Sequence, residues 1–390
     1  MIVNRLFVFS VFLAFFLSGQ NVLYSLGYFN LGGARIIPPA AIFFSLLTVL
    51  VLINKIAFKK NELVLLLFLV VTIFLYKVFG YNVDVAAMFV TWVIPVFVCF
   101  LWRNLNQQNS ALYLRKIFYV FYFTECGMAI VERVLHRCFF PNLLYETGFN
   151  LSKEGFRSYA LLGHPLSNSA LILTMLCGIL LFQKSEKIKM FALLMGFVAV
   201  LCFNSRFVFV ILSIVYSIYF FHHLFLERSA FVAKLQLTIY VGLLLTSVIF
   251  LLLHLGVGDR LVSMGLLDES SAAVRWKLFD IFTGAHWYDF LFPVSGAYYQ
   301  HMMRYFEYGI IENCWVIFLL RYGALYLISL LFLYSRFILD VFKSATKVEI
   351  CVMWIPWLVN VSSSNSLASA SFSIMFVILT YLILKDDVNK

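Results

Sequence analysis

The sequence predicts an all-α, polytopic integral membrane protein: a helix bundle of about 12 transmembrane helices with two long outward-facing loops. Hydrophobic residues make up 63% of the 390 residues and charged residues only 12%, and the mean hydropathy is +0.95, which excludes a soluble globular domain. Apolar runs recur along the chain, each long enough to cross roughly 30 Å of hydrocarbon as a helix. Short alternating segments typical of membrane barrels do not occur, so the spans are expected to be helices.

Twelve apolar segments fit helical spans within one polytopic domain of residues 1–390. They lie at about 6–26, 36–54, 62–79, 84–101, 117–131, 165–183, 190–204, 207–224, 235–256, 323–339, 349–362 and 371–384. The first segment follows Arg5 and is similar to a secretory signal. It lacks a clear small-x-small cleavage site and many spans follow it, so it is expected to remain as an uncleaved first helix.

The distribution of lysine and arginine predicts the orientation. Short loops and tails on the inner side hold the basic excess that the positive-inside rule requires when both termini are cytoplasmic. These residues are Arg5, Lys55, Lys59, Lys60, Arg103, Arg115, Lys116, Lys184, Lys187, Lys189, Arg228, Lys234, Arg336, Lys343, Lys347, Lys385 and Lys390. The loops 131–164 and 257–322 then face outward.

The net charge of +10 does not indicate nucleic-acid binding, because the basic residues are scattered through short loops rather than gathered in a stripe. Membrane lipids are the expected partners of the inner loops. The seven cysteines lie mainly in apolar spans and include no CxxC pair, so they predict neither a disulfide framework nor a zinc site. We interpret them as packing residues.

The outward loops favour arginine, whereas the inner loops favour lysine. Arginine binds phosphate oxygens through a planar fork, which lysine lacks. The outer arginines therefore predict a cavity, next to lipid, for a lipid-linked phosphate or pyrophosphate; for any single arginine, snorkelling to the headgroups is the alternative. These arginines are Arg133, Arg137, Arg157, Arg206, Arg260, Arg275 and Arg304.

Two short segments place polar groups at the outer ends of spans. Arg157 and His164 precede Pro165, a residue suited to the first turn of a helix, whose free N–H groups and positive dipole end would face the outer side. An ordinary capped helix start is the alternative. The tight turn at Asn204, Ser205 and Arg206 places a second arginine at the outer surface; alone, it is better explained as a snorkelling helix cap.

A carboxylate at the start of an apolar segment is costly and usually functional. Glu312 occupies such a position, where it could act as a general base on a sugar hydroxyl; a helix N-terminal carboxylate favoured by the dipole is the alternative. Aromatic residues of the second outer loop, among them Trp276, Tyr298 and Tyr299, could stack on sugars or anchor the loop at the interface.

Taken together, these segments resemble the bacterial O-antigen polymerases and O-antigen ligases (Wzy-type and WaaL-type membrane glycosyltransferases). Arg157…Gly163-His164-Pro165…Asn168 resembles that family's R…G…HPN segment, and Ser205-Arg206 resembles its SR turn. Glu312-Asn313, nine residues, Gly323-Ala-Leu-Tyr326 is similar to the ligase pattern H-[N/S/Q]-x9-G-x-x-[G/T/Y], with glutamate in place of histidine. The resemblance covers about residues 150–340, while the N-terminal third is similar only in hydropathy.

The glutamate favours the polymerase branch. The resemblance implies a GT-C-like enzyme in the bacterial inner (plasma) membrane, active on the periplasmic or extracellular side. It implies transfer from an undecaprenyl-pyrophosphate-linked oligosaccharide to the next lipid-linked repeat unit, together with a chain-length regulator partner. Arg157, Arg206 and Arg275 would stabilise the pyrophosphate, and Glu312 would activate the acceptor. His164, Asn313, Trp276, Arg304, Tyr298 and Tyr299 are the expected substrate-binding residues. No DxD motif occurs, so neither a metal nor another cofactor is expected.

Three alternatives stay open. A ligase of the same family would transfer the glycan to lipid A core or to protein. A flippase or transporter for lipid-linked oligosaccharide would have a similar number of spans, although transporters usually show internal repeats and polar sites near the midplane, and no convincing repeat of the two halves is found. A structural or assembly subunit would have no chemistry.

Overall fold

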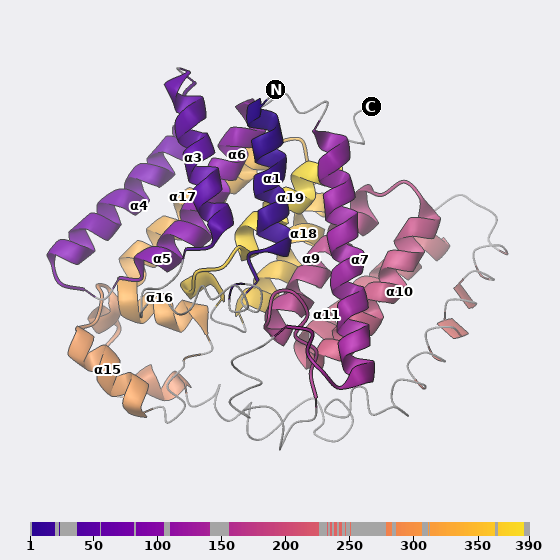
Figure 1. Ribbon diagram of the computed structural model, residues 1–390. Coiled ribbons are helices and arrows are strands. Elements are labelled where there is room, and N and C mark those ends of the chain that lie inside the picture. The colour runs from indigo at the N-terminus through magenta and orange to yellow at the C-terminus, as the bar shows by residue number, and fades with distance from the viewer. Residues whose placement is uncertain are drawn as a thin grey trace. The chain divides into compact units, whose positions relative to one another are not determined.

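The computed structural model describes residues 2–19, 23, 37–54, 56–81, 83–104, 110–140, 156–225, isolated positions between 232 and 250, 278–282, 286–305, 311, 313–362 and 366–385. All regular structure in these residues is helical (Figure 1), which confirms the predicted all-α class for this part of the chain. The chain forms two compact units. The first comprises residues 1–14, 33–113 and 267–379, and the second comprises 15–32, 114–266 and 380–390.

Helices occupy the predicted spans, with 235–256 lying almost wholly outside the described residues. In chain order they are α1 (Ile2–Phe16), α3 (Pro39–Ile53), α4 (Lys60–Val78), α5 (Val85–Ala87), η2 (Met88–Val93), α6 (Ile94–Asn104), α7 (Ala111–Leu135), α9 (Pro165–Phe182), α10 (Glu186–Phe203), α11 (Arg206–Phe225), η3 (Leu278–Phe282), η4 (Trp287–Phe290), α15 (Gly296–Tyr305), α16 (Cys314–Tyr322), α17 (Ala324–Val341), α18 (Lys347–Ser362), η5 (Ser366–Ala368) and α19 (Ser373–Lys385).

Four helices in the described part of the chain are long and apolar enough to cross a membrane: Lys60–Val78, Val85–Asn104, Pro165–Phe182 and Ala324–Val341. Shorter apolar helices lie at Ile2–Phe16, Pro39–Ile53, Arg206–Phe221 and Ser373–Lys385. The structure thus has the character of a helical membrane protein, and the count of twelve spans stays a prediction.

The first unit is held together by helix pairs with aromatic contacts. α3 packs on α6, and α4 packs on α17. The ring of Phe7 in α1 meets Phe44 of α3 with centroids 6.0 Å apart and Trp102 of α6 at 6.1 Å. Phe68 of α4 stacks on Tyr326 of α17 at 5.2 Å. Such ring pairs add to the stability gained from apolar burial.

The helix from Val85 to Asn104 widens into a π-helix, η2, at its centre. Thr91 of η2 donates a hydrogen bond to the carbonyl oxygen of Ser369 (2.6 Å) and accepts one from the N–H of Ser371 (3.0 Å). The indole N–H of Trp92 donates to the carbonyl oxygen of Leu367 at 3.2 Å. These bonds satisfy backbone groups of η5 and of the segment that follows it.

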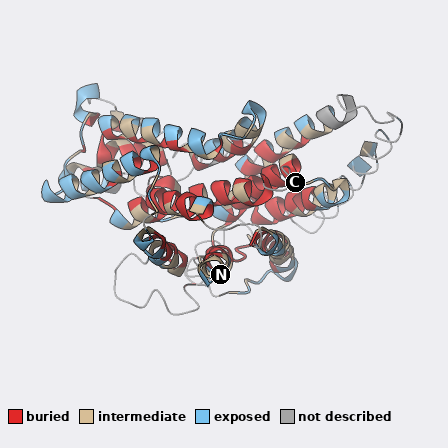
Figure 2. Cartoon of the chain, turned by 90° about the horizontal axis from the view of Figure 1, so that it is seen from above, coloured by how far each residue is buried: buried red, intermediate tan, exposed pale blue. Residues whose placement is uncertain are grey.

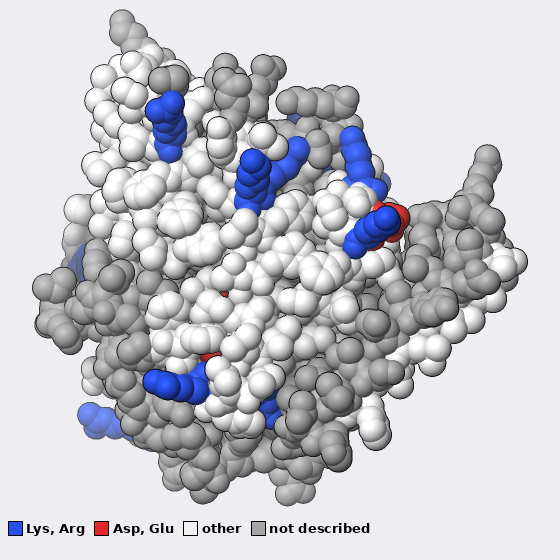
Figure 3. Space-filling view, turned by 45° about the vertical axis from the view of Figure 1, so that its right-hand side comes forward, with Lys and Arg blue, Asp and Glu red and all other residues white. Residues whose placement is uncertain are grey.

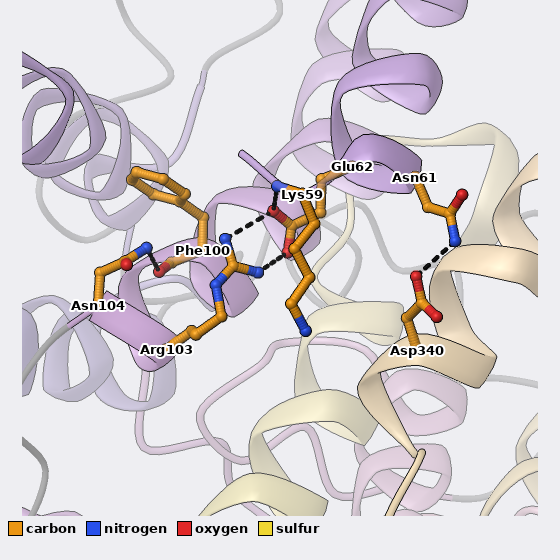
Figure 4. Close-up of polar contacts among 7 residues, drawn as sticks. All are labelled: Lys59, Asn61, Glu62, Phe100, Arg103, Asn104 and Asp340. Carbon is orange, nitrogen blue, oxygen red and sulfur yellow. Dashed lines mark hydrogen bonds and ion pairs between the residues drawn. The ribbon is translucent and has the colours of Figure 1, made fainter. Parts of the chain in front are cut away.

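A polar cluster joins the ends of three helices in the same unit (Figure 4). Glu62, in the first turn of α4, receives both terminal guanidinium nitrogens of Arg103 from the end of α6, the second at 3.0 Å. Its Oε2 also accepts the backbone N–H of Lys59 at 2.8 Å. Asn61 donates to the carboxylate of Asp340 in α17.

In the second unit, α9 packs against both α10 and α11 (Figure 1). The hydroxyl of Tyr122 in α7 donates to the carbonyl oxygen of Ala192 in α10 at 2.7 Å. Gly196 allows this approach, since a Cβ there would lie 2.4 Å from that hydroxyl. At the end of α19, the ring of Tyr381 contacts Phe182 of α9 at 5.8 Å.

The surfaces suit a lipid environment. α4 leaves most of its apolar side chains exposed and α17 leaves most of its apolar side chains at least partly exposed, whereas α9 and the Val85–Asn104 helix are mostly buried. Figure 2 shows exposed residues running along one face of several helices, with buried residues on the other face. On the face drawn in Figure 3, lysines and arginines lie singly on a mostly uncharged surface.

One predicted loop boundary differs in the structure, whereas the segment before Gly323 is the separate helix that the cost of burying Arg321 within a span predicts. α7 continues through Glu132 and Arg133 to Leu135, so the first outer loop begins after it rather than at residue 131. The segment before Gly323 is a helix of its own: α16 ends at Tyr322, and Gly323, with φ +83°, separates it from α17. Hydrogen bonds from α7 to residues 156–161, described below, explain the longer helix.

Candidate anion-binding site

The second unit contains a loop, residues 156–164, whose backbone is bound by buried side chains; we call it the anchored loop. Both oxygens of Glu132 in α7 are engaged. Oε2 accepts the N–H groups of Tyr159 (2.7 Å) and Ala160 (2.9 Å), and Oε1 accepts the N–H of Phe139 (2.9 Å). Glu132 is fully buried. Two of these three backbone donors belong to the anchored loop, and the carboxylate fixes it firmly because each bond would be costly to leave unmade.

Further side chains complete the attachment. Glu125, two helical turns earlier on α7, accepts the N–H of Leu161 at 3.2 Å. Ser158 donates its hydroxyl to the carbonyl oxygen of Ala129 at 2.6 Å, and the amide of Asn168 in α9 donates to the carbonyl oxygen of Tyr159. The predicted start of α9 is confirmed: Pro165 is its first residue, and His164 is the N-cap.

The anchored loop lies against the turn between α10 and α11, formed by Asn204 and Ser205. The N–H of Ser158 donates to the carbonyl oxygen of Cys202, the last turn of α10, at 3.2 Å. Asn204 ends α10 in the left-handed conformation, φ +55°, and α11 begins at Arg206. Asparagine tolerates this conformation better than most residues.

Helix direction places two N-termini at this end of the unit. α9 and α10 form a hairpin, as do α10 and α11, which the contact of Phe197 in α10 with both Phe209 and Tyr216 in α11 shows. α9 and α11 are therefore parallel neighbours. Their N-terminal N–H groups and dipoles attract negative charge. Arg157 lies in the anchored loop before α9, and Arg206 is the first residue of α11, so one arginine lies at or near the start of each of these helices.

Several buried polar atoms here have no hydrogen-bond partner among the described residues. They are both amide atoms of Asn204, the hydroxyl of Ser205, Nδ1 of His164 and Oδ1 of Asn168. Asn204 is 3% exposed and Ser205 is 2% exposed. Buried polar groups are nearly always hydrogen-bonded in proteins. Unfulfilled donors and acceptors gathered beside two helix N-termini indicate a site that is completed by a polar ligand.

His164 is neutral at physiological pH. Burial, and to a smaller extent the charge of Arg157, lowers the pKa of His164 from 6.5 to about 4. A neutral imidazole has one nitrogen that donates and one that accepts a hydrogen bond. His164 can thus bind either a phosphate oxygen or a sugar hydroxyl without adding charge to the site.

Three of the sequence-predicted site residues, Arg157, His164 and Arg206, are thus brought together at one end of the second unit. Three others, Arg275, Trp276 and Glu312, lie outside the described residues. The gathering of all predicted catalytic residues over one cavity therefore stays a prediction.

The remaining predicted residues belong to the first unit, where the structure gives two of them structural contacts. Asn313 is the N-cap of α16, and its side-chain oxygen accepts the N–H groups of Trp315 (3.0 Å) and Val316 (3.2 Å). Tyr299 is 7% exposed, and its ring covers the guanidinium of Arg321. These contacts occupy the side-chain oxygen of Asn313 and the ring face of Tyr299, so a substrate that bound either side chain would have to displace them.

Two further predicted residues lie on α15. Tyr298 is partly buried, and its backbone N–H is bonded to the hydroxyl of Ser295. Arg304 is exposed in the last turn. Both side chains are accessible enough to meet a ligand.

Sequence reasoning missed the residues that build the anchored loop. Glu125 and Glu132 are acidic groups within or beside an apolar helix, a placement that usually marks a functional or structural role. The sequence pattern pointed to Asn204 and Ser205 only as neighbours of Arg206 in the turn, not as site residues. In the described part of the chain, no three His, Cys, Asp or Glu side chains gather as metal ligands. No protein-family model matches the chain, and no curated protein or solved structure matches it either.

Proposed function

We propose that this protein is a polysaccharide repeat-unit polymerase of the bacterial inner membrane. It would transfer a glycan from an undecaprenyl-pyrophosphate carrier to the sugar at the far end of the next lipid-linked repeat unit, as in O-antigen or capsule synthesis. The observation that carries this proposal is the polar site of the second unit, where Arg157 and Arg206 lie at two helix N-termini, near buried polar atoms that have no partner among the described residues. The motif resemblance stated above supports the same reaction.

The site suits the leaving group of this reaction. In the transfer, the bond between the anomeric carbon and the pyrophosphate oxygen breaks, and its electron pair stays on the pyrophosphate. The acceptor hydroxyl oxygen forms the new glycosidic bond and loses its proton. Preorganised donors at the place where charge develops are often the largest contribution to catalysis. Arg157, Arg206 and the two helix starts would supply these donors, with Asn204 and Ser205 as further hydrogen-bonding partners.

The other roles rest on the sequence. Glu312 would accept the proton of the acceptor hydroxyl, and Arg275 would add a third positive charge beside the pyrophosphate. His164, whose imidazole is neutral, would hydrogen-bond a phosphate oxygen or a sugar hydroxyl. Holding the substrate between these groups would accelerate the transfer through proximity as well as through charge stabilisation.

The test is an assay of purified protein with lipid-linked repeat units, scored as a ladder of chain lengths on a gel. Arg206→Gln and Arg157→Gln should each lower the rate of chain extension by about 10²-fold or more, the loss typical when one donor to a developing charge is removed. Arg206→Lys should retain part of the activity, because it keeps the charge but loses the planar fork. Arg336→Gln is the matched control, since Arg336 is in α17 and contacts the ring of Phe332.

A deletion strain separates the proposed reaction from its relatives. Loss of a polymerase leaves single repeat units on the carrier, whereas loss of a ligase accumulates long lipid-linked chains. Loss of a flippase stops repeat units from reaching the outer side. A ladder unchanged in Arg157→Gln and Arg206→Gln, with the protein level maintained, would refute the proposal.

A further inference from the structure

The first unit contains a buried ion pair that the motifs do not include. Asp84 precedes α5, and Arg321 lies in the last turn of α16. The closest nitrogen–oxygen distance, between a terminal nitrogen of Arg321 and Oδ2 of Asp84, is 3.8 Å. The two side chains are 14% and 6% exposed, respectively. This distance gives charge attraction without a hydrogen bond.

The hydrogen-bonding capacity of Arg321 is unfulfilled. A guanidinium has five N–H donors, and among the described residues the Nε–H of Arg321 is buried without an acceptor, while a terminal nitrogen lies 3.8 Å from Oδ2 of Asp84. The ring of Tyr299 covers the guanidinium carbon at 4.9 Å, which stabilises the charge through the face of the ring. The positive charge of Arg321 is thus partly compensated by Asp84 and by the ring of Tyr299, but neither group accepts a hydrogen bond from the guanidinium.

Asp84, in contrast, is fixed. Its Oδ1 accepts the N–H of Ala87 at 3.1 Å and so caps α5. Its backbone N–H donates to the hydroxyl of Tyr322 at 3.3 Å. The hydroxyl of Tyr76 donates in turn to the carbonyl oxygen of Tyr322 at 2.7 Å. Asp84 therefore cannot move toward Arg321 without losing its own bonds.

We propose that Arg321 is an oxyanion-binding residue, which binds a phosphate or carboxylate group of the glycan substrate in competition with Asp84. An arriving oxyanion can accept short, charge-assisted bonds of about 2.7–2.9 Å from the guanidinium fork, which Asp84 does not accept. Exchange of a distant carboxylate for a bonded oxyanion gives the guanidinium the directional hydrogen bonds that Asp84 does not supply. Only the identity of the substrate rests on the proposed polymerase function, because the binding step requires no turnover.

The test compares three variants of the purified full-length protein in detergent: Arg321→Met, Asp84→Asn and the double variant. Each also carries Arg206→Gln, so that the anion site of the second unit contributes less to the signal. Affinity is measured by calorimetry with inorganic pyrophosphate and, separately, with glucuronate, at ionic strength matched with sodium chloride. Asparagine retains the oxygen that caps α5 and is a good N-cap.

Arg321→Met should weaken binding by about tenfold or more, because charge-assisted bonds are lost. Asp84→Asn should strengthen it by about threefold to tenfold, because a competing charge is removed. The double variant should bind as weakly as Arg321→Met, since Asp84 acts only through Arg321. Should Arg321→Met fail to fold because it leaves Asp84 buried and unpaired, the double variant, which removes both charges, gives the same comparison.

If the variants change the affinity for pyrophosphate alone, Arg321 binds the phosphates of the carrier. If they change the affinity for glucuronate alone, Arg321 binds an acidic sugar. The proposal is overturned if Asp84→Asn weakens binding or leaves it unchanged for both anions. It is equally overturned if the double variant binds either anion as tightly as the Arg206→Gln parent. These outcomes are independent of the ladder assay, so a failed polymerase assignment and a failed anion site can be told apart.

Discussion

The N–H of Ser158 donates a hydrogen bond to the carbonyl oxygen of Cys202 at 3.2 Å. This bond joins the anchored loop to the end of α10, and it therefore brings the segment of Arg157 beside the turn that precedes Arg206. Two arginines from separate parts of the sequence thus border one polar site. The predictions below test the contacts that hold this site, the contacts of the first unit, and their consequences for stability.

Glu132→Gln should destabilise the second unit. A glutamine side chain keeps one acceptor oxygen and replaces the other by an NH₂ group, so at least one of the three backbone N–H groups bound by Glu132 loses its acceptor. The expected loss is about 2 kcal/mol, a typical value for a buried group left unsatisfied. Thermal unfolding in detergent measures it. Glu125→Gln is the matched control, because Oε2 of Glu125 accepts the N–H of Leu161 while its Oε1 has no partner in the described structure. Equal losses in the two variants would contradict the role assigned to Glu132.

Stability should fall as the pH decreases from about 6.5 to about 4, in a manner that depends on His164. The pKa of His164 is lowered to about 4 by burial and by Arg157. In this window the unfolded chain binds a proton that the folded chain does not, so protonation favours unfolding. The contribution is at most about 3 kcal/mol, since one pKa unit corresponds to about 1.4 kcal/mol. His164→Gln should lose this component of the pH profile. If the stability of the variant and of the parent changed in parallel with pH, the contribution of His164 would be excluded.

Glu62→Gln should destabilise the first unit by about 2 kcal/mol, because it removes the charge that pairs with Arg103 while leaving Arg103 in place. Arg103 is 29% exposed, and solvent screening keeps the loss below that of a fully buried pair. Asn61→Ala is the control (Figure 4): it removes the exposed hydrogen bond to Asp340 and should change stability by less than about 0.5 kcal/mol. A larger loss from Asn61→Ala than from Glu62→Gln would be incompatible with this assignment.

Gly323→Ala should be strongly destabilising. Gly323 has φ +83°, and a Cβ there would lie 2.6 Å from the carbonyl oxygen of Leu291 and 2.7 Å from backbone atoms of Phe292. Gly80 has a similar φ of +74° but no atom within 4 Å of the added Cβ. Gly80→Ala should therefore cost only the conformational strain, about 1 kcal/mol, whereas Gly323→Ala adds a backbone clash and should cost more than about 2 kcal/mol. Unfolding midpoints of the two variants, measured side by side, decide the matter; similar midpoints would rule out the close approach.

Local features of the sequence predicted much of the secondary structure. Hydropathy located the helices that occupy the predicted spans, because the length of an apolar run is a local property. Pro165 predicted the start of α9 for the same reason, since the missing N–H of proline matters only at that position. The error at one loop boundary is equally instructive: α7 extends to Leu135, and Glu132 in its last turns binds the backbone of the anchored loop, a contact that hydropathy does not report.

The candidate site was predictable only in part. Arg157, His164 and Arg206 could be named because arginine beside a helix start favours an anion. The roles of Asn313 as a helix cap and of Tyr299 as the cover of Arg321 depend on bonds and contacts that form only in the folded chain. Their assignment to substrate binding was drawn from residue type, which does not show that the side chain is already engaged.

The sequence by itself determined that this chain is a helical protein with the composition of a membrane protein, and where its helices run, because burial in lipid selects residues one segment at a time. Only the tertiary structure decided which polar groups meet. Asp84 and Arg321 are far apart in the chain, as are Ser158 and Cys202, and neither pairing follows from spacing or composition. Polar contacts inside an apolar bundle depend on the packing of whole helices, since a buried donor must find its acceptor wherever the fold places one.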